Sequence, residues 1–274
     1  MFRTASQAAG RLALCVLVLV GAAVLLADWI PAHAYAEQTR QLPNAAPSAQ
    51  FPLGTDDLGR DRWARLLQGA RVSLLLAPAA ALLATVLGAG VGMAAALAGP
   101  TAQRATGFVI AIFMSFPWLF LLLMVRSALP LNVPAWTSVT LTFLLLGILG
   151  WASGARVVAT GTARILNSGY VLAAKAQGLS PLRIYARHLL PALRPLLAAQ
   201  YWVALPGFIL SEATLGLLGL GVSEPLPSLG GLTVELQNLP AVAESPWLLA
   251  PAVLLVVILL CLRAVPLARL GEPS

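Results

Sequence analysis

Residues 72–103 contain no charged side chain, and this feature restricts the fold of the chain more than any other. A helix of about 20 mostly apolar residues is long enough to cross the hydrocarbon core of a bilayer, whereas a soluble protein would expose such a run as an adhesive patch. Only 10% of all residues are charged, compared with about 25% in ordinary soluble domains. The sequence therefore predicts an all-α integral membrane protein.

The charge-poor windows predict six transmembrane helices. The first window resembles a signal peptide, because Arg3 and Arg11 precede it and a weak cleavage site follows at residues 32–34. Since the run is long and further spans follow, we interpret it as a retained first span. The six windows are residues 12–27, 72–103 (including a turn at Gly99-Pro100), 105–125, 136–154, 196–218 and 246–262.

The distribution of Lys and Arg predicts that both termini lie in the cytoplasm (N-in, C-in). With that orientation, 11 of the 17 basic residues fall in cytoplasmic segments, and residues 156–194 contain six of them without any acid. Five arginines oppose the rule because the segment between the first two spans would lie outside, although acids accompany them there. These are Arg40, Arg60, Arg62, Arg65 and Arg71.

The segment between the fourth and fifth spans predicts a basic helix–turn–helix. Residues 170–177 favour a helix, and Gly178 can adopt the left-handed conformation that ends one. Ser180 is a good N-cap, and Pro181 is favoured at the first helical position after it. The second helix is amphipathic, and Pro191 is expected to interrupt or kink it. Such a hairpin could bind acidic lipid or dock onto a soluble partner, and local chemistry leaves both alternatives open.

The run AAKAQGLSPLRIYARHLLP resembles the EAA motif of ABC importer permeases. The residues that match the motif by position are Ala173, Ala174, Gly178, Leu190 and Pro191, and Leu172 stands where the motif has its acid. The resemblance implies that this loop is a coupling helix, which sits in a groove of the ATP-hydrolysing subunit. The residues expected to couple the chain to the ATPase are Tyr170, Ala173, Ala174, Gly178, Leu179, Ser180, Arg183, Arg187 and Pro191.

Three further stretches resemble the permeases of dipeptide, oligopeptide and nickel importers. One of them, WASGARVVATGTARILNSGYVLAA, resembles the W-x-x-x-A-R stretch that leads into the EAA motif. The stretch FPLGTDDLGRDRWARLLQGARVSL, from Phe51, is similar to the family signature before the second span, with Phe51 in place of the usual His. The stretch EATLGLLGLGVSEPLPSLGG, from Glu212, is similar to the one that follows the fifth span. The matching signature residues are Gly54, Thr55, Asp56, Gly59, Arg60 and Asp61.

The resemblance implies a type I ABC importer permease fold in a bacterial inner (cytoplasmic) membrane. It implies a translocation pathway shared with a second, similar permease, for di- and oligopeptides or for nickel or a metal chelate. Two ATP-binding subunits and an extracytoplasmic substrate-binding protein are the other implied partners. The sequence contains no G-x-x-x-x-G-K-[ST] phosphate loop. We therefore expect ATP and Mg²⁺ on the partner subunits, no cofactor or metal on this chain, and no enzymatic activity of its own.

The expected organisation has three parts. Residues 1–70 form the first span and a periplasmic segment, in which residues 61–70 are expected to form a short helix on the membrane surface because their apolar side chains share one face. Residues 71–266 form the permease domain, which includes a cytoplasmic coupling loop at 155–195. Residues 267–274 form a short cytoplasmic tail.

Two features inside the spans also suggest function. Glu212 is the only acid within a span, which makes it a candidate for the pathway or gate, with a structural pairing to Arg126 or to the backbone as the alternative. An ion-coupled secondary transporter is a more distant reading, since that class needs carboxylates near the midplane and Glu212 stands alone. In the second span, Gly88, Gly92 and Ala96 form a stripe of small residues that predicts close approach of another helix, from this chain or from another subunit.

Overall fold

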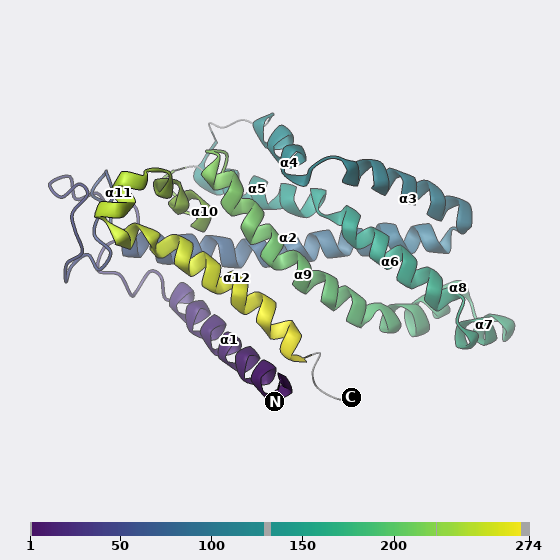
Figure 1. Ribbon diagram of the computed structural model, residues 1–274. Helices are drawn as coiled ribbons and strands as arrows, with labels where there is room; N and C mark the ends of the chain where they lie inside the picture. The colour runs from purple at the N-terminus through teal and green to yellow at the C-terminus, as the bar shows by residue number, and fades with distance from the viewer. Residues whose placement is uncertain (1, 129–132, 223, 270–274) are drawn as a thin grey trace. The chain divides into compact units, whose positions relative to one another are not determined.

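The computed structural model describes residues 2–128, 133–222 and 224–269, and all named elements in these ranges are helices. The expected all-α fold class is thereby confirmed. A π-helical turn lies at Tyr185–Leu189, and 3-10 turns lie at Thr233–Gln237 and Pro246–Leu249. The α-helices are α1 (Phe2–Leu25), α2 (Arg62–Leu97), α3 (Pro100–Ser115), α4 (Trp118–Ser127), α5 (Ala135–Leu149), α6 (Trp151–Leu166), α7 (Gly169–Ala176), α8 (Pro181–Ile184), α9 (Leu190–Leu217), α10 (Leu229–Leu232), α11 (Leu239–Glu244) and α12 (Ala250–Arg269) (Figure 1). Of the expected tail, residues 270–274 lie outside the described ranges.

Five helical stretches in the described part of the chain are long and apolar enough to cross a membrane, rather than the six expected. They are Gln7–Leu25, Arg62–Leu97, Ala135–Leu166, Tyr185–Leu217 and Pro246–Pro266. The difference lies in the expected third span, which is divided between α3 and α4. Helix α3 ends at Ser115, and Phe116 is extended with φ −78° and ψ 130°. Because the residue before a proline avoids the helical conformation, Pro117 accounts for this break.

Helix α2 is longer at its N-terminal end than the sequence suggested. Its 36 residues run without interruption from Arg62, so the expected separate surface helix at residues 61–70 is wrong. Asp61 caps the helix, since its Oδ1 accepts a hydrogen bond of 2.8 Å from the Trp63 N–H. Residues 62–77 contain no proline to stop the helix, and Ala64, Leu67 and Ala70 are buried. Burial raises the pKa of Asp61, although hydrogen bonds from the backbone of the first turn oppose the shift.

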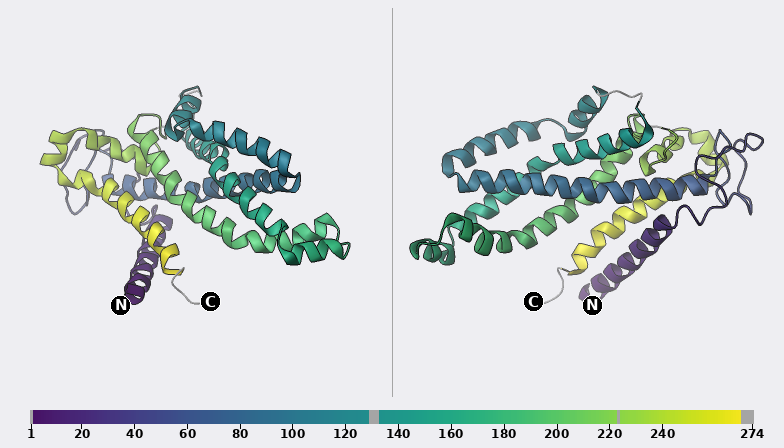
Figure 2. Two further views of the ribbon diagram at one scale, coloured as in Figure 1. Left: turned by 45° about the vertical axis from the view of Figure 1, so that its right-hand side comes forward. Right: turned by 180° about the vertical axis from the view of Figure 1, so that it is seen from behind.

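The described helices form two compact units. Unit 1 comprises residues 1–78, 125–143 and 206–274, and unit 2 comprises residues 79–124 and 144–205. In unit 1, α1 packs along α12, so the first and last helices of the chain lie side by side (Figures 1 and 2). In unit 2, α6 packs against α3. Unit 2 also contains α7 and α8, which follow α6 directly (Figure 2).

The small residues of α2 serve a contact inside unit 2. A Cβ atom placed on Gly92 would lie 2.5 Å from the carbonyl oxygen of Ala155 and 2.8 Å from the amide nitrogen of Ala159. A Cβ atom on Gly88 would lie 2.9 Å from the carbonyl oxygen of Trp151. The stripe therefore brings the backbones of α2 and α6 together within this chain.

The irregular segment before α2 is held by its own contacts. Thr55 forms an isolated antiparallel bridge with Asp61, and the Thr55 hydroxyl accepts a hydrogen bond of 2.8 Å from the Ala45 N–H. The His33 ring stacks on Phe51, with 4.8 Å between ring centroids and 16° between ring planes. These contacts fix the family signature residues at the start of α2.

Candidate functional sites: a basic helical hairpin and a buried charge cluster

The hairpin formed by residues 169–191 begins with α7, and α7 ends as the sequence predicts. Gly178 has φ 75°, which is the left-handed conformation. Its N–H donates to the Lys175 carbonyl at 2.9 Å, and the Leu179 N–H donates to the Ala174 carbonyl at 3.2 Å. These two bonds make a Schellman motif, which satisfies the last carbonyls of the helix and reverses the chain.

The second arm of the hairpin runs without a stop into α9. Pro191 was expected to interrupt or kink this helix, but it is the second residue of α9 and follows the π-helical turn at residues 185–189. A proline ring clashes with the carbonyl four residues earlier, here that of Arg187. In the π turn the Leu190 N–H donates instead to the Tyr185 carbonyl, five residues earlier. The wider turn accommodates the proline while the helix continues.

The structure separates the two alanines of the expected coupling motif. Ala173 is exposed, whereas Ala174 is only 6% exposed. Leu172, at the position of the motif's acid, is 50% exposed, and the Tyr170 ring lies 6.0 Å from that of His188. Of the remaining expected coupling residues, Leu179 is half-buried, and the exposed ones are Tyr170, Gly178, Ser180, Arg183, Arg187 and Pro191. A partner could therefore reach Ala173 but not Ala174 without local rearrangement.

A second candidate site is the charge cluster of Asp56, Arg60, Arg65 and Glu224 in unit 1. Arg60 Nε lies 2.6 Å from Asp56 Oδ2, and Arg60 Nη1 lies 2.7 Å from Glu224 Oε2. Arg65 Nη2 lies 2.8 Å from Glu224 Oε1, and its Nε lies 3.5 Å from Asp56 Oδ2. The two arginine side chains are only 8% and 5% exposed. The positive charges of these two buried arginines are balanced by the buried carboxylate of Asp56 and by the carboxylate of Glu224, whose side chain is 63% exposed.

The cluster also defines the charge state of its central arginine. Burial alone would lower the pKa of Arg60, but the hydrogen bond to Asp56 and the charge of Glu224 raise it overall. Arg60 is therefore a permanent cation that holds the signature segment to the chain after α9. The signature pointed to Asp56 and Arg60, but nothing in the local sequence indicated Glu224, which is 164 residues from Arg60.

Two further ion pairs join distant segments of unit 1. Arg62 pairs with Glu235 and also donates from Nε to the Thr55 carbonyl at 2.8 Å. Arg71 Nη1 lies 2.5 Å from Asp28 Oδ2. Together with the charge cluster, these contacts give acidic partners to four of the five arginines that opposed the charge-based orientation.

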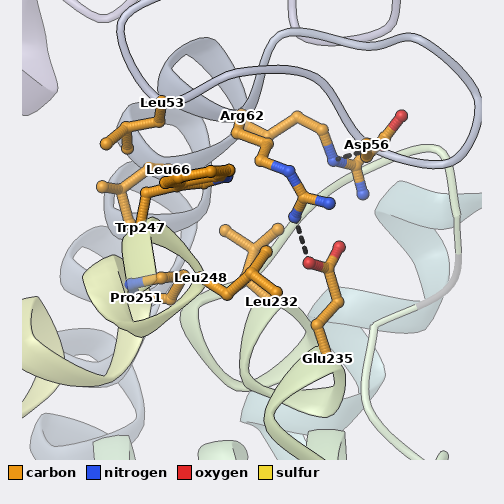
Figure 3. Close-up of a pocket in the computed structure, with 10 residues that line it drawn as sticks. Leu53, Asp56, Arg62, Leu66, Leu232, Glu235, Trp247, Leu248 and Pro251 are labelled. Atoms are coloured by element: carbon orange, nitrogen blue, oxygen red, sulfur yellow. Dashed lines mark hydrogen bonds and ion pairs between the residues drawn. The ribbon is translucent and has the colours of Figure 1, made fainter. Parts of the chain in front are cut away.

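The Arg62–Glu235 pair closes one side of a small pocket (Figure 3). The pocket has a volume of about 20 Å³, enough for about one water molecule. Figure 3 shows Leu53, Leu66 and Trp247 gathered away from the ion pair, so the pocket has a polar and an apolar side.

Glu212 joins three helices of unit 1 instead of lining an open cavity. It is completely buried in α9, and its Oε2 accepts a hydrogen bond of 3.1 Å from the Ser73 hydroxyl of α2. The same hydroxyl accepts a bond of 3.3 Å from the Leu229 N–H of α10. A Cβ atom on Gly230 would lie 2.9 Å from Glu212 Oε1. A substrate could reach this carboxyl group only if the helices around it separated.

The alternative partner for Glu212, the side chain of Arg126, lies outside the described residues. Among the described residues, no three His, Cys, Asp or Glu side chains gather into a group that could hold a metal ion.

Comparison with known proteins places these features in a family. The model of the family "Binding-protein-dependent transport system inner membrane component" matches residues 73–268. The oligopeptide transport system permease protein OppC of Escherichia coli (strain K12) is 32% identical over 251 residues, which cover 90% of this chain and 80% of OppC. The dipeptide transport system permease protein DppC of Bacillus subtilis (strain 168) is 30% identical over 236 residues, which cover 85% of this chain and 71% of DppC.

The fold is also found among solved structures. An inward-facing structure of the MetNI methionine ABC transporter contains a chain that matches with a TM-score of 0.59 and 19% sequence identity, over 76% of this chain and 97% of that chain. At this identity the likeness concerns the fold alone, and it supports an all-helical permease fold. The family match covers well over half of the sequence, so the chain belongs to the binding-protein-dependent transport system inner membrane components and is a permease subunit of an ABC transporter.

Proposed function

We propose that this permease forms, together with a second permease, the pathway by which an ATP-driven importer carries di- or oligopeptides. The observation that carries this proposal is the 32% identity to an oligopeptide permease over 80% of that protein's length. The similarity to a dipeptide permease supports the same substrate class. The alternative is that a transporter of the same kind carries nickel or a metal chelate. The uptake experiment below distinguishes the two substrates.

We further propose an N-in, C-in arrangement with six spans, of which the third is the broken pair α3 and α4. The bias of Lys and Arg supports it, because 11 of the 17 basic residues fall in segments that this arrangement places in the cytoplasm. In this arrangement the charge cluster lies on the extracytoplasmic side, where a substrate-binding protein would deliver peptide. The 169–191 hairpin lies in the cytoplasm, where ATP-binding subunits would carry ATP and Mg²⁺.

The proposed coupling is mechanical. ATP binding closes two ATP-binding subunits onto each other, and the hairpin moves with the subunit in which it sits. Because α8, the π turn and α9 follow one another without a loop, displacement of the hairpin would pass directly into α9. The pathway would then change from inward-facing to outward-facing by a shift of populations.

The substrate proposal predicts a specific loss of peptide uptake. Cells that lack this chain should lose uptake of labelled di- or oligopeptides and recover it with the wild-type gene, while nickel uptake stays unchanged. If nickel uptake alone is lost, the chain is still a permease of an ATP-driven importer, but its substrate is nickel and not peptide. If neither uptake changes, the peptide proposal is wrong.

The coupling proposal predicts that bulk at Ala173 uncouples the transporter. Ala173→Trp should lower peptide uptake about tenfold or more, as expected for an obstructed contact at the centre of an interface. It should also reduce co-purification of the ATP-binding subunits, while membrane insertion remains normal. Ala173→Ser keeps the side chain small and should retain both properties. Normal uptake and co-purification in Ala173→Trp would exclude this face of α7 as the coupling surface.

A further inference from the structure

The charges of this chain are divided unequally between the two units. Unit 2 contains seven of the 17 Lys and Arg residues and none of the ten Asp and Glu residues. Unit 1 contains the other ten basic residues and all ten acidic residues, so its formal charge is zero. The whole net charge of +7 therefore belongs to unit 2. The cations of unit 2 therefore have no carboxylate within their own unit, which favours the binding of a negatively charged ligand there. They are Arg104, Arg156, Arg164, Lys175, Arg183, Arg187 and Arg194.

One of these cations lines a groove in unit 2. The groove has a volume of about 630 Å³ and lies between the α2–α3 turn, the end of α6 and the 169–191 hairpin. Pockets for small molecules typically measure about 300–1,000 Å³. Apolar and polar groups both contribute to its wall, and the residues that matter here are Leu97, Gln103, Leu166, Asn167, Lys175 and Leu179.

With α2 taken as a membrane span, the groove lies at the end of that span, because Ala96 and Leu97 line it. The apolar part of α2 ends at Leu97, and the chain turns at Gly99 before α3 begins. An element at this level meets lipid headgroups and the first part of the acyl chains. Lys175 is exposed, and Arg104 and Arg164 are exposed residues next in sequence to the groove residues Gln103 and Ala163.

We propose that this groove binds the headgroup of one anionic phospholipid. The phosphate would take Lys175 as its counter-charge, while Gln103 and Asn167 supply amide donors. The leucines of the wall would contact the glycerol backbone and the upper acyl chain. An anionic lipid supplies what unit 2 lacks, a negative charge at membrane level. The proposal requires that α2 spans the membrane, but it does not depend on the proposed substrate or coupling.

The site would have a structural effect on the hairpin. A lipid that contacts both Lys175 of α7 and Gln103 of α3 would bridge α7 and the start of α3. The proposed site thus makes the position of α7 sensitive to the fraction of anionic lipid in the membrane.

Native mass spectrometry of the assembled, delipidated transporter tests the proposal. Phosphatidylglycerol, phosphatidylcholine or free glycerol phosphate would be added to the wild-type complex and to variants. Wild type should bind one phosphatidylglycerol that Lys175→Gln binds about fivefold more weakly, the effect of one lysine at an anionic headgroup. Gln103→Trp, which fills the groove without changing its charge, should lose the same lipid. Arg263→Gln removes an exposed cation of unit 1 and should bind as wild type does.

Each other outcome overturns the proposal. Equal binding of phosphatidylcholine would exclude recognition of an anionic headgroup, and competition by free glycerol phosphate at the same concentration would identify a phosphate site instead of a lipid site. Unchanged phosphatidylglycerol binding by Lys175→Gln would place the lipid elsewhere. If Lys175→Gln instead loses its ATP-binding subunits while it retains the lipid, the groove belongs to a protein interface.

Discussion

Replacing Asp56 with alanine is expected to lower the free energy of unfolding by about 3–5 kcal/mol, the range found when one partner of a buried ion pair is removed. The variant leaves the two buried guanidinium groups of Arg60 and Arg65 with Glu224 as their shared carboxylate. It also removes the acceptor of hydrogen bonds from the Leu58 and Arg60 N–H groups, at 3.0 Å and 2.8 Å. Thermal unfolding of the purified permease in detergent measures the effect.

The neighbouring residue provides a matched control for Asp56→Ala. Asp57 is exposed, and Asp57→Ala removes the same carboxylate group from the same segment. Its effect should stay within about 0.5 kcal/mol, as is usual for surface substitutions. Adding Arg60→Met to Asp56→Ala leaves Arg65 and Glu224 as a balanced pair, so the double variant should recover part of the loss. Equal melting of the Asp56 and Asp57 variants would show that the cluster does not stabilise the fold.

Gly92→Ala is expected to destabilise the permease by about 1–3 kcal/mol, because the added methyl group overpacks a helix contact. The new Cβ atom would lie 2.5 Å from the carbonyl oxygen of Ala155 and 2.8 Å from the amide nitrogen of Ala159. Both are backbone atoms, so α2 and α6 must move apart to admit the methyl group. Gly92→Leu should destabilise the permease by more than Gly92→Ala does. The measurements are melting in detergent and the amount of protein in the membrane.

Gly90 is the internal control for this prediction. It lies in α2, two residues from Gly92, and a Cβ atom there meets nothing within 4 Å. Since alanine favours a helix by up to about 1 kcal/mol over glycine, Gly90→Ala should leave stability unchanged or raise it. If the two variants melt alike, helix propensity and not the α2–α6 contact determines their stability.

The local chemistry of the sequence predicted the end of α7 and the helical character of the apolar windows, because these signals lie within a few residues of the structure they specify. Gly178 ends α7 as expected, and the long apolar windows became helices. The same local rules misjudged two prolines. Pro117 lies within an apolar window that suggested one continuous span, yet it divides α3 from α4. Pro191 was expected to interrupt or kink its helix, which a π turn preserves.

Contacts across long sequence separations could not be predicted. Glu224 and Glu235 lie in the segment after α9, and their arginine partners are more than 150 residues away. The orientation of Ala174 toward the interior likewise depends on how the hairpin packs, which periodicity over an eight-residue helix does not determine. For Glu212, the sequence identified an unusual buried acid, but the hydroxyl that binds it comes from α2.

The contact of α2 with α6 has a consequence for the response of the permease to temperature. Gly92 and Gly88 bring backbone against backbone, and the surrounding lipid is as apolar as the side chains it replaces. Association there depends on dispersion at short range and not on the release of water. Apolar burial from water carries a large heat-capacity change and weakens on cooling. Little of the stability of the α2–α6 contact comes from burial of apolar surface out of water. Cooling therefore weakens this contact less than it weakens the core of a soluble protein.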